Sequence, residues 1–219
     1  LSFVPNTKMK LSYAASIATD TLPDHLKKKY KKELDTFNAI SVREDSAVQL
    51  LRSISIHDAV VTLDPTLLLD SEEWETILEP CPINEKYLFC YFLGDDLLER
   101  NVAKTYAVKR GLKIVTLPCL LGKFRRCDVD FGDYHLYDVS PGMMLSLIKN
   151  AEYVFTDSFH ATVFSLIFKR QHFIFQRAGS QSMSVRIETL TKLFGTQDYF
   201  CNTPDKATME YVDSLSSID

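Results

Sequence analysis

The 219-residue chain is 46% hydrophobic and 25% charged, and its formal net charge is −4. These values are ordinary for a water-soluble globular protein, and the length leaves room for one large domain or two modest ones. The basic residues are scattered apart from the run 27–32, and no apolar stretch approaches the ~20 residues that cross a bilayer. Neither a nucleic-acid partner nor a membrane-spanning segment is therefore predicted, and five widely spaced cysteines favour reduced thiols in the cytoplasm.

Segments rich in β-branched and aromatic residues alternate along the chain with segments of helical periodicity. Because strand, helix and strand follow one another repeatedly, the fold class is α/β, with parallel sheets covered by helices on both faces. The predicted strands are 11–16, 39–43, 59–63, 87–93, 113–117, 152–156 and 172–175, and the predicted helices are 23–37, 45–53, 71–78, 95–110, 141–150, 160–170 and 185–194.

The composition changes at 79–84, where Pro80 and Pro82 stop a helix and no strand continues. We place a domain boundary there, with residues 1–80 in a first parallel-sheet domain and residues 81–219 in a second. A further irregular stretch, 117–133, is long enough to predict a loop with a function of its own. Its arginines, Arg125 and Arg126, either reach an acidic sugar or are solvated.

The run 152–168 reads as a strand, a tight turn and a buried helix. An apolar strand ends at Thr156, Asp157 and Ser158 are able to cap a helix, and an almost wholly apolar helical run begins at His160. Such a turn lies at the carboxyl edge of a parallel sheet, where ligands bind and where helix-start N–H groups favour anions. A histidine there, with an ordinary pKa of about 6.5, can give or take a proton near neutrality.

Each residue of this turn also has a simpler interpretation. For His160 the alternative is an imidazole that is satisfied by the local backbone, and for Ser158 it is a plain N-cap, a role that is compatible with binding an anion. Asp157 either orients His160 or caps the helix.

Polar residues also follow two predicted strands in the first part of the chain. Arg43 closes an apolar strand, so its guanidinium is expected at a sheet's carboxyl edge, where it can bind a carboxylate or a phosphate. Asp64 and Thr66 follow the next strand, and the alternative for this Asp-Pro sequence is an ordinary turn. Arg186 lies early in a predicted helix. For Arg43 and for Arg186 the alternative is a surface salt bridge.

The run 138–165, Asp-Val-Ser-Pro-Gly through Thr-Asp-Ser-Phe-His-Ala-Thr-Val-Phe-Ser, closely resembles the polysaccharide pyruvyl transferase family, whose members commonly carry T-D-S-F-H-G-T. Three further pieces agree in order: 13–16, 40–44 and 63–69. Ala161 stands where the family usually has glycine. The family's glycine-rich amino-terminal segment is absent, so the numbered chain is expected to begin partway through the first domain.

The resemblance implies two Rossmann-like domains arranged as in glycosyltransferase-B-type proteins. It also implies an enzyme of cell-surface polysaccharide biosynthesis that moves pyruvate from phosphoenolpyruvate onto a saccharide, free or lipid-linked, as a ketal. No cofactor is expected, and the histidines, acids and cysteines show no metal-ligand spacing. The catalytic residue would be His160, and the substrate-binding residues would be Arg43, Ser158, Asp157, Arg186, Asp64, Thr66, Tyr13 and Ser16.

Two other functions fit the same pattern. One is a nucleotide-sugar-dependent glycosyltransferase of the same architecture, and the other is a non-catalytic saccharide-binding module. Localisation is expected to be cytoplasmic, with membrane association through a lipid-linked acceptor as a variant. Release of phosphate from phosphoenolpyruvate separates the pyruvyl transferase from both of these alternatives.

Overall fold

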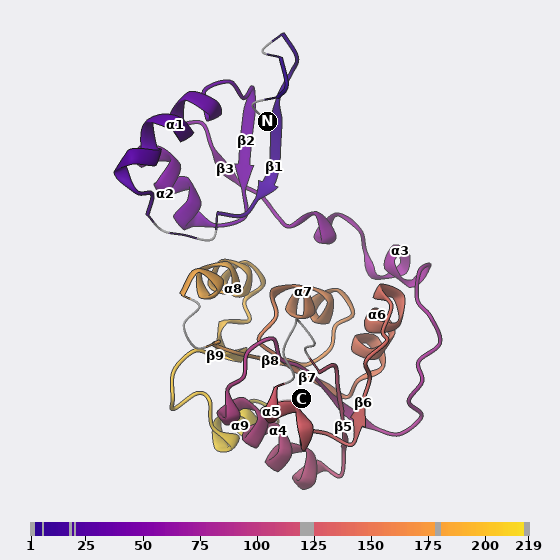
Figure 1. The fold of residues 1–219 in the computed structure, drawn as a ribbon. Coiled ribbons are helices and arrows are strands. Elements are labelled where there is room, and N and C mark those ends of the chain that lie inside the picture. Colours follow the sequence, from indigo (N-terminus) through magenta and orange to yellow (C-terminus); the bar gives the residue numbers. More distant parts are fainter. Residues whose placement is uncertain are drawn as a thin grey trace. The chain divides into compact units, whose positions relative to one another are not determined.

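The computed structural model describes residues 3–5, 7–17, 19, 21–118, 125–177 and 181–216, except for the side chains of 181–183. The chain forms two compact units (Figure 1). The first unit comprises Leu1–Leu68 with Gln181–Leu193, and the second comprises Leu69–Ser180 with Phe194–Asp219.

This division differs from the predicted boundary at 79–84. The segment after Leu68 packs Trp74, Leu78 and Cys81 against a core cluster of the second unit. The helix before the two prolines ends at Glu75, and Pro80 and Pro82 lie in an irregular segment within the second unit, so they do not separate the units. The division also differs from the prediction at the helix predicted over 185–194, which was assigned to the second domain. The segment Gln181–Leu193 belongs to the first unit.

The first unit is built on a small parallel sheet in the order β1-β2-β3. Helices α1 and α2 lie on the same side of this sheet (Figure 1). Val42, Ala47 and Leu51 lie in its core. The elements are β1 (Leu11–Ala15), α1 (Asp24–Leu34), β2 (Ala39–Val42), α2 (Asp45–Ser53), β3 (Val60–Val61), the 3-10 helix η1 (Pro65–Leu68) and α8 (Gln181–Phe194).

The second unit contains a larger parallel sheet in the order β6-β5-β4-β7-β8-β9. Its strands are β4 (Tyr87–Tyr91), β5 (Lys113–Thr116), β6 (Tyr134–His135), β7 (Tyr153–Thr156), β8 (His172–Phe175) and β9 (Phe200–Cys201). Its helices are α3 (Ser71–Glu75), α4 (Leu97–Arg110), α5 (Arg126–Val129), α6 (Pro141–Asn150), α7 (Phe159–Ile167), the 3-10 helix η2 (Gln197–Tyr199) and α9 (Met209–Ser216).

Alternate residues of these strands enter two separate cores. Phe155 and its neighbours on one face of the sheet pack with Tyr106 of α4 and Val212 of α9. Val154 and its neighbours on the other face pack with Leu147 of α6 and with α7. Helices thus cover both faces of the sheet (Figure 1), as predicted. The α/β class with two Rossmann-like parallel sheets is confirmed.

The strand order of the second unit reverses beside β4. The chain passes from β4 outward to β5 and β6, and it returns to β7 on the opposite side of β4. In open α/β sheets, ligands bind outside the carboxyl ends of the strands at such a reversal. The ends of β4 and β7 therefore mark the expected ligand edge of this unit.

Observed and predicted elements differ mainly at their ends. The strand predicted at 59–63 is only Val60–Val61, and α7 begins one residue early and ends at Ile167. Lys169 follows with a positive φ of 53°, a conformation in which a helix cannot continue. The short elements β6, β9, α5 and α9 were not predicted. The predicted loop 117–133 lies partly outside the described residues, and its described part contains α5.

Candidate functional site

The predicted turn joins β7 to α7 at the ligand edge of the second unit. Ser158 is the N-cap of α7, and its Oγ accepts a hydrogen bond from the Ala161 N–H at 3.5 Å. The Thr156 hydroxyl donates to the Tyr91 carbonyl oxygen at 2.6 Å and accepts from the Ser158 N–H at 3.0 Å. These bonds fix the turn against the last residue of β4. The capping role predicted for Ser158 is thus present.

Asp157 connects the two sides of the strand-order reversal. The residue is fully buried, and its carboxylate accepts hydrogen bonds from the Leu93 N–H at 2.7 Å and the Gly94 N–H at 2.6 Å. The guanidinium of Arg177, which follows β8, donates from Nε to the same carboxylate at 2.9 Å. Asp157 therefore positions the loop after β4. Its carboxylate is directed to these donors, and the capping of α7 falls to Ser158.

Gly94 is required by this arrangement. A Cβ at this position would lie 2.9 Å from Arg177 Cγ and 3.0 Å from Asp157 Oδ2. Any side chain at residue 94 would therefore displace the carboxylate or the arginine that binds it.

His160 lies in the first turn of α7 and is exposed. Its ring contacts the buried ring of Phe159 edge-on, with the ring centroids 5.4 Å apart. The imidazole is thus presented to solvent at the carboxyl edge of β7. This is the place at which the sequence predicted a proton donor.

Two arginines hold the loop after β4 by its carbonyl oxygens. Arg125 donates to the carbonyl oxygens of Leu93 and Gly94 at 2.8 and 2.7 Å, and its Nε donates to Asp128 at 2.8 Å. The buried Arg100 donates to the Gly94 carbonyl oxygen at 2.9 Å and to Asp128 at 2.8 Å. Arg125 thus supports the loop after β4, and this role is neither the contact with an acidic sugar nor the solvation that the sequence suggested. Arg126 is exposed.

Glu99 is a second buried carboxyl group beside this loop. Burial raises its pKa to about 8, and the nearby charge of Asp157 acts in the same direction. The guanidinium of Arg100, whose Nη1 lies 3.0 Å from a Glu99 oxygen, offsets only part of this shift. The protonated form of Glu99 is therefore favoured at neutral pH.

In the first unit, Arg43 and Asp64 form an ion pair at the ends of β2 and β3. The Thr66 hydroxyl and N–H also donate to Asp64, at 2.7 and 3.0 Å. Burial alone would raise the pKa of Asp64, but the hydrogen bonds from Thr66 and the bond and charge of Arg43 hold it below its usual range. The structure thus brings three of the predicted residues together.

Glu44 gathers two other predicted residues of the first unit. Its side chain is 1% exposed and accepts hydrogen bonds from the Ser16 hydroxyl and, at 3.4 Å, from the Ile17 N–H. Arg186 Nε lies 3.8 Å from the same carboxylate. Glu44 occupies the N-cap position of α2, but its side chain makes no capping bond. Tyr13, on β1, is 52% exposed.

The predicted site residues thus form three groups: the turn with Asp157, Ser158 and His160, the Arg43–Asp64–Thr66 cluster, and the Glu44 cluster with Ser16 and Arg186. The prediction that Arg43 and His160 face one cleft concerns the two units together and stays a prediction. Sequence reasoning missed Arg177, Gly94 and Glu44. Arg177 had a usable signal, because it comes just after the predicted strand 172–175, much as Arg43 closes the predicted strand 39–43.

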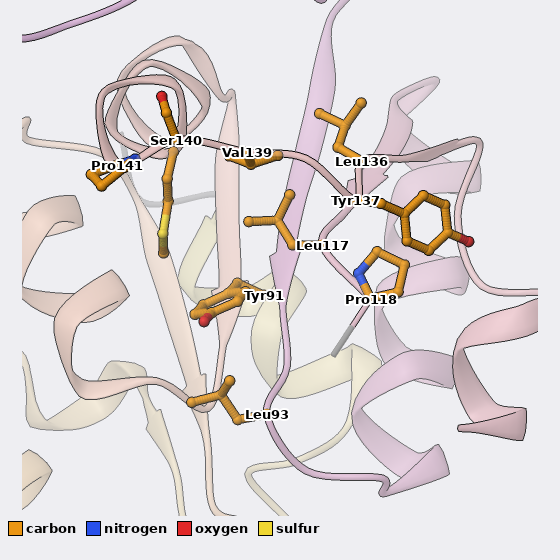
Figure 2. A pocket seen from close by; sticks show the side chains of 10 residues that line it. Tyr91, Leu93, Leu117, Pro118, Leu136, Tyr137, Val139, Ser140 and Pro141 are labelled. Carbon is orange, nitrogen blue, oxygen red and sulfur yellow. The ribbon is translucent and has the colours of Figure 1, made fainter. Parts of the chain in front are cut away.

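A pocket of about 550 Å³ opens beside the turn in the second unit (Figure 2). It lies at the ends of β4, β5 and β6 and at the start of α6. No residue in its described lining carries a formal charge. The lining residues are Tyr91, Leu93, Leu117, Pro118, Leu136, Tyr137, Val139, Ser140, Pro141 and Met144.

Neither a metal-binding cluster nor a membrane-spanning helix occurs among the residues that the structure describes. No group of three or more histidine, cysteine, aspartate or glutamate side chains in this part of the chain is placed to hold a metal ion. None of the helices that the structure describes has both the length and the apolar composition for crossing a bilayer.

The fold and the turn define an α/β protein whose ligand edge carries a capped helix start and an accessible histidine. The family model of the polysaccharide pyruvyl transferases matches residues 1–178, so the chain belongs to this family. Membership implies a transferase of polysaccharide biosynthesis that acts on a saccharide acceptor.

Among solved structures, the chain is similar to UDP-GlcNAc 2-epimerase from Neisseria meningitidis bound to UDP-GlcNAc. The TM-score is 0.49 and the sequence identity 12%, over 91% of this chain and 67% of that chain. No curated protein gave a significant match.

Proposed function

We propose that this protein transfers pyruvate from phosphoenolpyruvate to a saccharide and forms a ketal. The observation that carries the proposal is the exposed imidazole of His160 in the first turn of α7, next to the strand-order reversal. A proton donor and a helix start that favours anions thereby occupy the same turn. Family membership supports the same reaction class.

The proposed reaction begins with proton transfer from His160 to the methylene carbon of phosphoenolpyruvate. This makes the central carbon electrophilic, and an acceptor hydroxyl adds to it while losing its own proton. The bond from that carbon to the phosphate oxygen breaks, and a second hydroxyl closes the ketal. Of the two hydroxyl protons, one restores His160 and the other leaves on phosphate, so neither an oxidant nor a reductant is consumed. Acid–base help of this kind is typically worth ~10²–10⁴ in rate.

The donor brings a carboxylate and a phosphate, which require cationic and N–H partners. The start of α7 favours one anionic group through its backbone N–H groups and its dipole. We propose that the arginines Arg43 and Arg186 supply the guanidinium contacts, with Ser158, Asp64, Thr66, Tyr13 and Ser16 as further binding residues. Asp157 contributes by fixing the turn. The reaction needs no cofactor, and we place it in the cytoplasm with a free or lipid-linked saccharide acceptor.

The test is release of inorganic phosphate from phosphoenolpyruvate by the full-length protein, measured against a panel of saccharides. Acceptor-dependent release, together with a product carrying the added mass of a pyruvate ketal, is the expected result. Turnover of a nucleotide sugar instead would identify a glycosyltransferase. Saccharide binding without turnover of either donor would identify a non-catalytic module. Each of these two results contradicts the proposal.

A further inference from the structure

The pocket of Figure 2 has no part in the steps assigned to His160. Tyr91 is the last residue of β4, while Leu117 and Leu136 follow β5 and β6. Its volume of about 550 Å³ falls within the range of about 300–1,000 Å³ that is typical of small-molecule sites. The pocket is therefore large enough for one or two sugar rings.

The lining excludes the donor and suits a neutral ligand. An anion in this pocket would lose hydration without meeting a charged partner in the described lining, and such burial is costly. The lining instead combines the rings of Tyr91 and Tyr137 and the apolar Pro118 with side-chain hydroxyl groups. A pyranose ring has the matching chemistry, because its C–H faces are apolar and its edge carries hydroxyl groups. Tyrosine is suited to such contacts, since it offers an apolar face and a polar tip.

The pocket also borders the turn that carries His160. Tyr91 is the register partner of Thr156, and the Thr156 hydroxyl binds the Tyr91 carbonyl oxygen at 2.6 Å. Leu93, another lining residue, donates its N–H to Asp157 at 2.7 Å. The pocket and the turn therefore lie at the ends of neighbouring strands, which are ~4.8 Å apart.

We propose that this pocket binds a neutral pyranose unit of the acceptor saccharide, with Tyr91 and Tyr137 as its ring contacts. The assignment rests on the proposed function and adds to it the place and the chemical class of the acceptor. In Figure 2, Leu117 lies between the two tyrosines. Tyr137 is 56% exposed, so its replacement removes a ligand contact with little loss of core packing.

The experiment compares Tyr137→Ala, Tyr137→Phe and Tyr30→Ala. Tyr30, on α1 of the first unit, is 45% exposed and serves as the matched control. Binding of cellobiose and of N,N′-diacetylchitobiose is measured by saturation-transfer NMR, with UDP and glucuronic acid as competitors. Tyr137→Ala should weaken sugar binding about tenfold, equivalent to about 1.4 kcal/mol, while the other two variants retain it. In turnover, Tyr137→Ala should raise the acceptor KM and leave the KM for phosphoenolpyruvate unchanged.

The measurement of sugar binding does not depend on catalysis, so the proposed function and the pocket assignment fail in different ways. Absence of phosphate release by the wild-type protein removes the proposed function, whereas the NMR titration still reports on the pocket. The pocket assignment is overturned if neither neutral sugar binds or if Tyr137→Ala binds them as tightly as Tyr30→Ala. Displacement of the sugars by UDP or by glucuronic acid overturns it as well.

Discussion

Replacing Asp157 by alanine should destabilise the second unit strongly. The fully buried carboxylate accepts hydrogen bonds from two backbone N–H groups and from Arg177. Removing one partner of a buried ion pair typically costs about 3–5 kcal/mol, because the remaining charge and donors lose their partner. The Arg177 side chain is 22% exposed and can regain some hydration, so the lower end, about 3 kcal/mol, is expected.

The measurement is chemical denaturation followed by the fluorescence of Trp74. This residue is the only tryptophan of the chain, and its ring packs edge-on against Phe164 of α7, with centroids 5.0 Å apart. The signal therefore reports unfolding of the second unit. Asp24→Asn is the matched control, because the Asp24 side chain is 94% exposed and should leave the transition unchanged. A loss below about 1 kcal/mol for Asp157→Ala would refute the positioning role, because that is the effect of an ordinary hydrogen bond.

Three further predictions concern the same edge of the sheet. His160→Gln should lower turnover ~10²-fold or more while donor affinity stays within a few-fold, because glutamine donates a hydrogen bond but delivers no proton. Steady-state kinetics give kcat and the KM for phosphoenolpyruvate, and a wild-type kcat would end the general-acid assignment. Because the pKa of Glu99 rises from 4.5 in the unfolded chain to about 8 in the fold, its contribution to stability is complete below pH 4.5 and is lost as the pH rises through about 8. Glu99→Gln should therefore flatten the decline of the denaturation midpoint with pH between these two values. A midpoint that declines with pH as steeply as in the wild type would contradict the raised pKa of Glu99. Gly94→Ala should reduce stability by about 1–3 kcal/mol through its clash with Arg177 and Asp157, whereas a wild-type midpoint would show that the loop absorbs the methyl group.

Elements with strong local signals were predicted closely. The helices 45–53 and 141–150 and the strand 172–175 have the predicted bounds, because apolar periodicity and, for α6, Ser140 before Pro141 mark their extent. The two-residue strands β6 and β9 have no such pattern. They exist through pairings such as Val115 with Tyr134 and Ile174 with Phe200, which only the folded chain provides.

The candidate site shows the same limit. The turn with Ser158 and His160 was predictable because one continuous stretch encodes the strand, the cap and the helix. The contact of Asp157 with Gly94 and Arg177 was not, because its members are separated by many residues and meet only across neighbouring strands. A charged residue after a strand shows where its side chain will emerge, but the identity of its partner depends on the strand order.

The placement of α8 has a consequence for the covalent connectivity of the protein. The backbone passes between the units at 68/69, at 180/181 and at 193/194, so no single cut yields two intact halves. A fragment ending at Leu68 would lack α8 and with it Arg186, which lies against the buried Glu44. A fragment beginning at Leu69 would carry α8 without the rest of its unit. Dissection of this protein therefore requires excision of 181–193 and its reattachment to the first unit.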